Sequence, residues 1–211
     1  MSFLTGTTKL VNTSAIPAGV SRSAAVSLLH DHDFFLRCEP HYVSHRTLPP
    51  TEASSSASAS AAAKSEYQLP RDLEPVGEPP VKLYEVVDHV PNPVWSSSVV
   101  SNEEFVDFKD GLWVRIRSPL AVVMETRWTI RERKKNKKEK TTTSENGKGE
   151  GEEGEEEGEL ELVEDVMISC SKLLMGIVKG QVDTNWREIH RRIAARLVED
   201  AKKKKAGEGK E

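Results

Sequence analysis

The residues best suited to metal chemistry are four consecutive side chains, His30 to Asp33, which alternate histidine and aspartate. Imidazole and carboxylate are usual ligands of zinc and iron. Consecutive side chains in a helix or turn point in different directions, however, so four neighbours seldom converge on one ion. His41 and His45 lie nearby but do not clearly complete a site. We interpret the four residues as a solvated turn that ends a helix, and we predict no metal ligand and no cofactor.

A second group of candidates places carboxylates and guanidinium groups on predicted strands. Side chains alternate along a strand, so one of Glu164 and Asp165 should face the inner side of a sheet. Glu125 and Arg127 share a face of their strand, and Arg115 lies on the strand before. Inside an apolar cavity these groups would orient the polar head of a ligand. On the solvent face they would form cross-strand ion pairs, which is the interpretation we favour.

Nucleophilic catalysis finds no support in the spacing of residues. No arrangement of Ser, His and Asp, or of Cys and His, is legible, and there is no nucleophile elbow. The two cysteines, Cys38 and Cys170, have no metal-binding spacing and are too few for a disulfide framework. We interpret them as buried thiols in a reducing compartment. The sequence therefore predicts no catalytic residue.

The element that must position any site is a long helix expected over Leu173 to Val198. Its apolar side chains recur at steps of three and four, on one stripe. At 1.5 Å per residue the helix would be about 35–40 Å long. Such a stripe must be buried against another element. Because the preceding residues read as strands, the helix should lie across an antiparallel sheet, an arrangement that often encloses a cavity. The stripe consists of Leu174, Ile177, Val178, Val182, Trp186, Ile189, Ile193 and Leu197.

The strands are indicated by alternating apolar residues and by turn signals. A short helix over Ala24 to Leu29, capped by Ser21 or Ser23, should follow the first strand, and Phe34 to Leu36 should form an apolar turn. The expected strands are 9–16, 41–48, 82–90, 95–108, 112–117, 120–130 and 160–169.

Composition indicates one domain with two inserts. The chain has 211 residues and a net charge of −4, without a basic signature for nucleic acid. Residues 49–80 are rich in Ser, Ala and Pro, and residues 131–159 in Lys, Glu and Gly, so neither can bury enough apolar surface to become ordered. We predict a single domain over 1–200, disordered inserts at 49–80 and 131–159, and a charged disordered tail over 201–211. No apolar run suits a signal peptide or a spanning helix, so we expect a cytoplasmic protein.

Three stretches resemble the START-like helix-grip fold, also called the SRPBCC superfamily: "IPAGVSRSAAVSLLHDHDFFLRCEPHYVSH", "EFVDFKDGLWVRIRSPLAVVMETRWTI" and "LELVEDVMISCSKLLMGIVKGQVDTNWREIHRRI". More narrowly, they look like a fungal family of unassigned function. The resemblance implies an α+β fold, in which a curved antiparallel sheet of six to seven strands wraps a long C-terminal helix, with one or two short helices after the first strand. Members bind sterols, phospholipids, polyketides or hormones, and a minority are cyclases or hydrolases. Fold alone does not choose among these functions.

We therefore predict non-catalytic binding of a hydrophobic small molecule, such as a lipid, a sterol or a polyketide-like compound, between sheet and helix. One alternative is a cyclase or hydrolase that uses a buried carboxylate, which a raised carboxyl pKa in a closed cavity would favour. The other is an interaction module whose core is filled by side chains. We predict no nucleic-acid partner and no transmembrane segment; transient membrane contact and oligomeric state stay open. The predicted ligand-binding residues are Trp113, Arg115, Met124, Glu125, Arg127, Trp128, Glu164, Met167, Met175, Val178, Val182 and Trp186.

Overall fold

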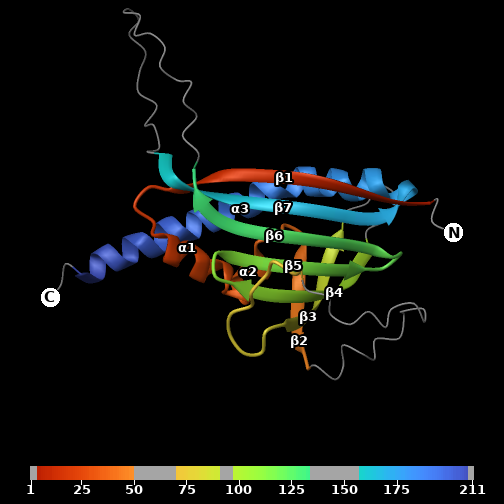
Figure 1. The fold of residues 1–211 in the computed structure, drawn as a ribbon, viewed down its shortest axis with the longest axis horizontal. Helices are drawn as coiled ribbons and strands as arrows, with labels where there is room; N and C mark the ends of the chain where they lie inside the picture. Colours follow the sequence, from red (N-terminus) through yellow and green to blue (C-terminus); the bar gives the residue numbers. More distant parts are fainter. Residues whose placement is uncertain (1–3, 50–69, 91–96, 134–156, 209–211) are drawn as a thin grey trace, which may run out of the picture.

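The computed structural model describes residues 4–49, 70–90, 97–133 and 157–208. Seven antiparallel strands form one curved sheet, and a long helix lies along one of its faces (Figure 1). This arrangement confirms the predicted α+β helix-grip fold class. The elements are β1 Thr5–Pro17, α1 Arg22–Leu29, α2 His32–Arg37, β2 Tyr42–Leu48, β3 Lys82–Val90, β4 Ser97–Phe108, β5 Gly111–Ser118, β6 Val122–Glu132, β7 Glu157–Ser171 and α3 Lys172–Glu208.

The strand order of the sheet is β1-β7-β6-β5-β4-β3-β2, so β1 and β2 form its edges. Each strand from β2 to β6 pairs with the next strand in sequence, whereas β1 pairs with β7 from Thr5↔Ser171 onward. The β4–β5 hairpin turns just before Gly111. A Cβ at Gly111 would lie 1.8 Å from the carbonyl oxygen of Trp128, so only glycine lets β6 approach the hairpin this closely.

The core lies between the inner face of the sheet and the helices. The last turns of the α3 stripe are fully packed there, with Ile193 and Leu197 at 1% and 3% exposure. Towards the start of α3, Val178 and Val182 are only half-buried, and Ile177 is 59% exposed. The helix therefore packs tightly on the sheet at one end and loosely at the other.

The outer face of the sheet is partly covered by residues 70–81. Leu73 packs with Val106, Phe108 and Trp113 in a second apolar cluster, and Pro75 forms a β-bridge to Phe108. The last residues of the predicted insert over 49–80 therefore pack against the sheet instead of being disordered, because Leu73 provides an apolar anchor. The predicted disorder of residues 50–69 and 134–156 lies outside the described residues.

The expected solvated turn at residues 30–33 is wrong for its second histidine. The helix α2 begins at His32, where a turn was expected. Asp31 caps this helix by accepting a hydrogen bond from the backbone N–H of Phe34. His32 is 5% exposed. Its Nδ1 lies 2.9 Å from the Tyr84 hydroxyl and its Nε2 lies 2.7 Å from Asp107 Oδ1. The imidazole is buried because two strands supply polar partners, which a local pattern does not reveal.

The end of α3 also differs from expectation. The helix continues to Glu208 instead of giving way to a disordered tail at residue 201. Ion pairs one turn apart, Arg196–Asp200 and Lys203–Glu199, support this extension. Within the part of the chain that the structure describes, no helix is both long and apolar enough to cross a membrane.

Candidate functional site

A cavity of about 560 Å³ lies between the inner face of the sheet and the loosely packed half of α3. Ligand sites in proteins commonly fall in the range of about 300–1,000 Å³. Alternation along β5 and β6 sends Val114, Ile116, Met124 and Trp128 to this face. The remaining apolar lining comes from α2, from β3 and β4, from the loop between β5 and β6, from the start of β6 and from α3: Phe35, Leu36, Val86, Val99, Pro119, Leu120, Val122, Leu174, Ile177, Val178, Val182, Trp186 and Ile189.

The cavity meets solvent between the β5–β6 loop and the first turns of α3. Leu120 and Ile177 both line it, yet they are 75% and 59% exposed. Leu120 and Ala121 have φ angles of 61° and 57°, in the left-handed region that side chains other than glycine seldom adopt. The strained loop therefore holds an apolar leucine at the mouth of the cavity.

Three carboxyl groups line the cavity on the side of β3 and β4. Burial, followed by repulsion from Asp88, raises the pKa of Glu103 to about 8. Burial, again followed by repulsion from Asp88, raises the pKa of Glu39 to about 7. Burial alone raises the pKa of Asp88 to about 6. Near neutral pH these groups therefore differ in protonation, and Glu103, which has the highest pKa of the three, is the most fully protonated.

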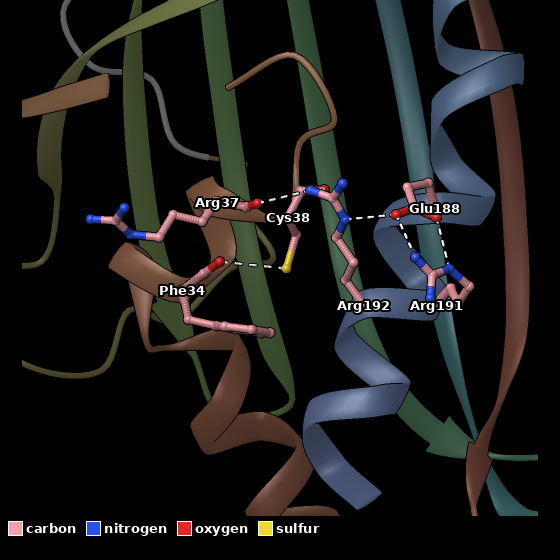
Figure 2. A network of polar contacts seen from close by, with 6 residues as sticks. All are labelled: Phe34, Arg37, Cys38, Glu188, Arg191 and Arg192. Atoms are coloured by element: carbon pink, nitrogen blue, oxygen red, sulfur yellow. Dashed lines mark hydrogen bonds and ion pairs between the residues drawn. The ribbon is translucent and has the colours of Figure 1, made fainter. Parts of the chain in front are cut away.

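Hydrogen bonds fix the end of α2 to α3 (Figure 2), just before Glu39, which lines the cavity. Arg192 of α3 donates hydrogen bonds to the carbonyls of Arg37 and Cys38, at 3.2 and 3.4 Å. Glu188 in turn accepts a hydrogen bond of 2.8 Å from Arg192 Nε. Glu39, which follows Cys38 in sequence, accepts a hydrogen bond of 2.8 Å from the Asn185 side chain. One face of α3 thus positions both the backbone before this carboxyl group and the carboxyl group itself.

A second polar group connects α3 to β1 and β7. Glu164 accepts a hydrogen bond of 2.8 Å from Asn12, and its Oε2 lies 3.6 Å from Nε2 of the buried His190. His190 Nδ1 lies 2.8 Å from the Ser14 hydroxyl. Ser, His and Glu are the components of a catalytic triad. Ser14 does not line the cavity, however, so a ligand in the cavity would not reach its hydroxyl group. We interpret the contacts among Ser14, His190 and Glu164 as an attachment of α3 to the sheet.

Both cysteines are free and buried, as expected from their number. Burial raises the pKa of the Cys38 thiol to about 12, so the thiolate needed for nucleophilic attack is not formed near neutral pH. Among the described residues, no group of three or more His, Cys, Asp or Glu side chains is arranged to hold a metal ion.

The structure brings six of the residues predicted to bind a ligand to the cavity. They come from two strands, β6 and β7, and from α3, which the sequence placed on opposite sides of the same space. These residues are Met124, Trp128, Glu164, Val178, Val182 and Trp186.

The other six predicted residues do not line the cavity. On β5, the apolar Leu112, Val114 and Ile116 occupy the inner face, so Trp113 packs in the outer cluster. Arg115 also faces outward, where it binds Glu104 and Glu125 at 3.1 and 2.9 Å. Cross-strand pairs on the outer face were the favoured interpretation of these charges.

Arg127 and Met167 follow the same alternation and face outward, whereas Met175 lies on α3 and packs with the apolar cluster of Val166, Ile168 and Cys170. Arg127 forms an ion pair with Asp72 and lies over the Phe108 ring. Met167 pairs in register with Lys9 and Glu125 on the outer side. Met175 belongs to α3 but packs beside β1, where it would contact a Cβ built at Gly6.

Sequence reasoning missed three of the four acidic residues that line the cavity, Glu39, Asp88 and Glu103. A signal was present on two strands. Asp88 has the same parity as the buried Tyr84 and Val86, and Glu103 the same parity as the buried Phe105. A carboxylate on an apolar face is a candidate site residue, because an unpaired buried charge is costly. Glu39 lies outside regular structure, and no local pattern indicates its position.

The curved sheet, the long helix and the cavity between them define a helix-grip protein. The chain belongs to the family described as a domain of unknown function, DUF7053, whose model matches residues 5–199. No curated protein matches it.

Among solved structures, the chain is similar to the di-domain ARO/CYC StfQ from the steffimycin biosynthetic pathway. The TM-score is 0.53 and the sequence identity is 11%, over 92% of this chain and 52% of that one. At this identity the likeness shows the fold alone. The chain spans about half the length of the StfQ chain.

Proposed function

We propose that this protein binds a hydrophobic small molecule in the cavity between the sheet and α3. The observation that carries the proposal is the cavity of about 560 Å³, with mainly apolar walls and a mouth at Leu120 and Ile177. Its volume argues against the alternative of an interaction module whose core is filled by side chains. Lipids, sterols and polyketide-like compounds are the ligand classes we propose.

The driving force would be removal of apolar surface from water. A ligand that buries about 300 Å² of apolar surface would gain about 7.5 kcal/mol at about 25 cal/mol per Å². Lost translational and rotational freedom offsets at least about 4 kcal/mol of this gain. A ligand held by desolvation alone would therefore bind weakly, and the polar groups of the cavity would add affinity and orientation.

The similarity to StfQ, an ARO/CYC protein from the steffimycin biosynthetic pathway, supports a polyketide-like ligand among the proposed classes. The support is indirect, through the shared fold. The proposed intracellular location and fungal source are further predictions that rest on the sequence.

A second candidate function is a small-molecule cyclase that uses cavity carboxyl groups. The observation that favours it is the spread of pKa values, from about 6 at Asp88 to about 8 at Glu103. At neutral pH Glu103 would hold a proton to donate, while Asp88 would be ionised and able to accept one. Pairs of carboxyl groups with separated pKa values are the pattern of general acid and base catalysis.

An apolar fluorescent probe tests binding directly. We expect the folded protein to bind the probe with increased emission, and Val178→Trp, which fills the cavity, to weaken binding. Val11→Trp is the matched control, since Val11 is 62% exposed on the outer face of β1. Equal probe binding by both variants would refute a ligand site beneath α3. Native mass spectrometry of protein purified from its own source would identify what co-purifies.

A further inference from the structure

The ionisable groups that line the cavity are almost all acidic. Glu39 follows α2, Asp88 and Glu103 come from β3 and β4, and Glu164 comes from β7. His41, before β2, is the one histidine among the described lining residues, and none of those residues is Lys or Arg. The polar lining from α3 consists of the neutral Gln181 and Asn185. The described lining therefore offers no lysine or arginine to neutralise these carboxyl groups.

Buried carboxyl groups on the two faces of β4 have different partners. On the outer face, Glu104 is 6% exposed and lies 3.1 Å from both Arg115 and Arg117. On the inner face, the adjacent Glu103 is 7% exposed and accepts one hydrogen bond, from Ser101 at 3.0 Å. Glu104 on the outer face is thus neutralised by two arginines, whereas the equally buried Glu103 on the cavity side is bound by a neutral serine.

The next carboxyl group on the cavity side is Asp88 of β3. Its Oδ1 is inaccessible to solvent and lacks a hydrogen-bond partner in the described part of the chain. A buried polar atom without a partner is unusual and calls for an explanation. Glu39 and Glu103 are close enough to Asp88 for its charge to disfavour their ionisation. The three carboxyl groups thus form one acidic region on a wall of an otherwise apolar space.

We propose that the cavity selects hydrophobic molecules that carry a basic nitrogen, whose protonated amine lies among Glu39, Asp88 and Glu103. The inference rests on the proposed binding function and names the class of ligand. An ammonium group has three donors and no acceptor, which matches carboxyl oxygens that lack donors. It also supplies the opposite charge that a buried carboxylate needs. Ligands with a carboxylate or phosphate head would meet like charge and bind less well.

The proposal has a proton linkage with a definite sign. An alkylamine, like lysine, has a pKa near 10 and binds as the cation. Its charge favours ionisation of the three carboxyl groups, so binding releases protons from them. Affinity for the amine should therefore rise between pH 5 and pH 8, while affinity for a neutral ligand should not follow this trend. Calorimetry in two buffers of different ionisation enthalpy measures the released protons.

Three ligands of equal chain length test the selectivity: dodecylamine, dodecanol and dodecanoic acid, each below its micelle concentration, as competitors of a neutral fluorescent probe at pH 7.5. We expect the amine to bind at least about tenfold more tightly than the alcohol, and the acid less tightly than the alcohol. Asp88→Asn and Glu103→Gln should remove most of the amine preference and leave alcohol binding within about threefold. Asp165→Asn, on the exposed outer face of β7, is the control that changes the same net charge without effect.

The outcomes separate this inference from the proposed function. If neither the probe nor any of the three ligands binds, the binding function is refuted and the inference falls with it. If the alcohol or the acid binds as tightly as the amine, the amine inference alone is refuted. An amine preference that survives both cavity variants would refute the assignment to these carboxyl groups. If a variant fails to fold, the wild-type ligand series and its pH dependence still decide the inference.

Discussion

Replacing Glu103 by glutamine should remove a large part of the pH dependence of stability. The pKa of this carboxyl group rises from an ordinary 4.5 to about 8 in the folded protein. Between these two values the folded state keeps a proton that the unfolded state releases, so the free energy of unfolding falls as pH rises. Below pH 4.5 both states are protonated, and above pH 8 both are ionised.

The magnitude follows from the pKa difference. At about 1.4 kcal/mol for each pKa unit, a difference of about 3.5 corresponds to about 5 kcal/mol. Repulsion from Asp88 and Glu39 contributes to this difference, and both groups remain in the variant. Glutamine keeps an oxygen that accepts the Ser101 hydrogen bond, and it carries no charge. We therefore expect Glu103→Gln to be more stable than the wild type above pH 8, by about 3–5 kcal/mol, and about equal to it near pH 4.5.

Urea denaturation at pH 5, 6, 7, 8 and 9 measures this difference, with each free energy taken from a full transition. The gap between variant and wild type should open as pH rises, mainly between pH 5 and pH 8. Asp165→Asn, which removes an exposed carboxylate from the outer face, should follow the wild-type curve in parallel. Parallel curves for Glu103→Gln and wild type would show that Glu103 is ionised at little cost, and the reasoning on the acidic wall would fail.

Three further predictions concern His32, Trp186 and the chain segment between β6 and β7. His32→Phe should cost about 2–4 kcal/mol, seen as a lower urea midpoint, because it leaves Asp107 and Tyr84 without their buried imidazole partner; an unchanged midpoint would contradict this. Trp186→Ala should cost less than the 3–5 kcal/mol typical of a fully buried tryptophan, because the ring is only half-buried, and should alter probe binding. Replacing residues 134–156 by a short Gly-containing turn should leave Tm within a few degrees, since Glu132 and Leu160 already pair across the hairpin; loss of cooperative unfolding would refute it.

The fold was predictable because periodicity acts over short distances. Alternation in β5 and β6, and the three- and four-residue steps of α3, correspond to elements found in the structure. The face of each strand was harder to predict where both faces are apolar. Trp113 was such a case: the outer face of β5 is covered by Leu73, from a segment about 40 residues earlier that composition assigned to an insert. A long-range contact of this kind leaves no local pattern.

The apolar lining of the candidate site was largely predictable, whereas of its four acidic residues only Glu164 was predicted. Trp128, Val178 and Trp186 belong to periodic stripes, and such stripes face the core. Glu103 and Asp88 break the apolar pattern of their strands, and the ordinary interpretation of such residues is a solvent face. Their burial follows from the curvature of the sheet and from the position of α3, which are properties of the assembled fold.

The pairing of β1 with β7 has a consequence for how the chain folds. The Asn12 side chain and its partner Glu164 are 152 residues apart in sequence. At a synthesis rate of about 5–20 residues per second, β1 waits about 8–30 s on the ribosome before β7 emerges. During this time Leu10 and Ile16 have no sheet to pack against. Contacts of such high sequence separation slow folding, so sheet closure at β1 should be a late event, and the waiting strand a natural target for chaperones.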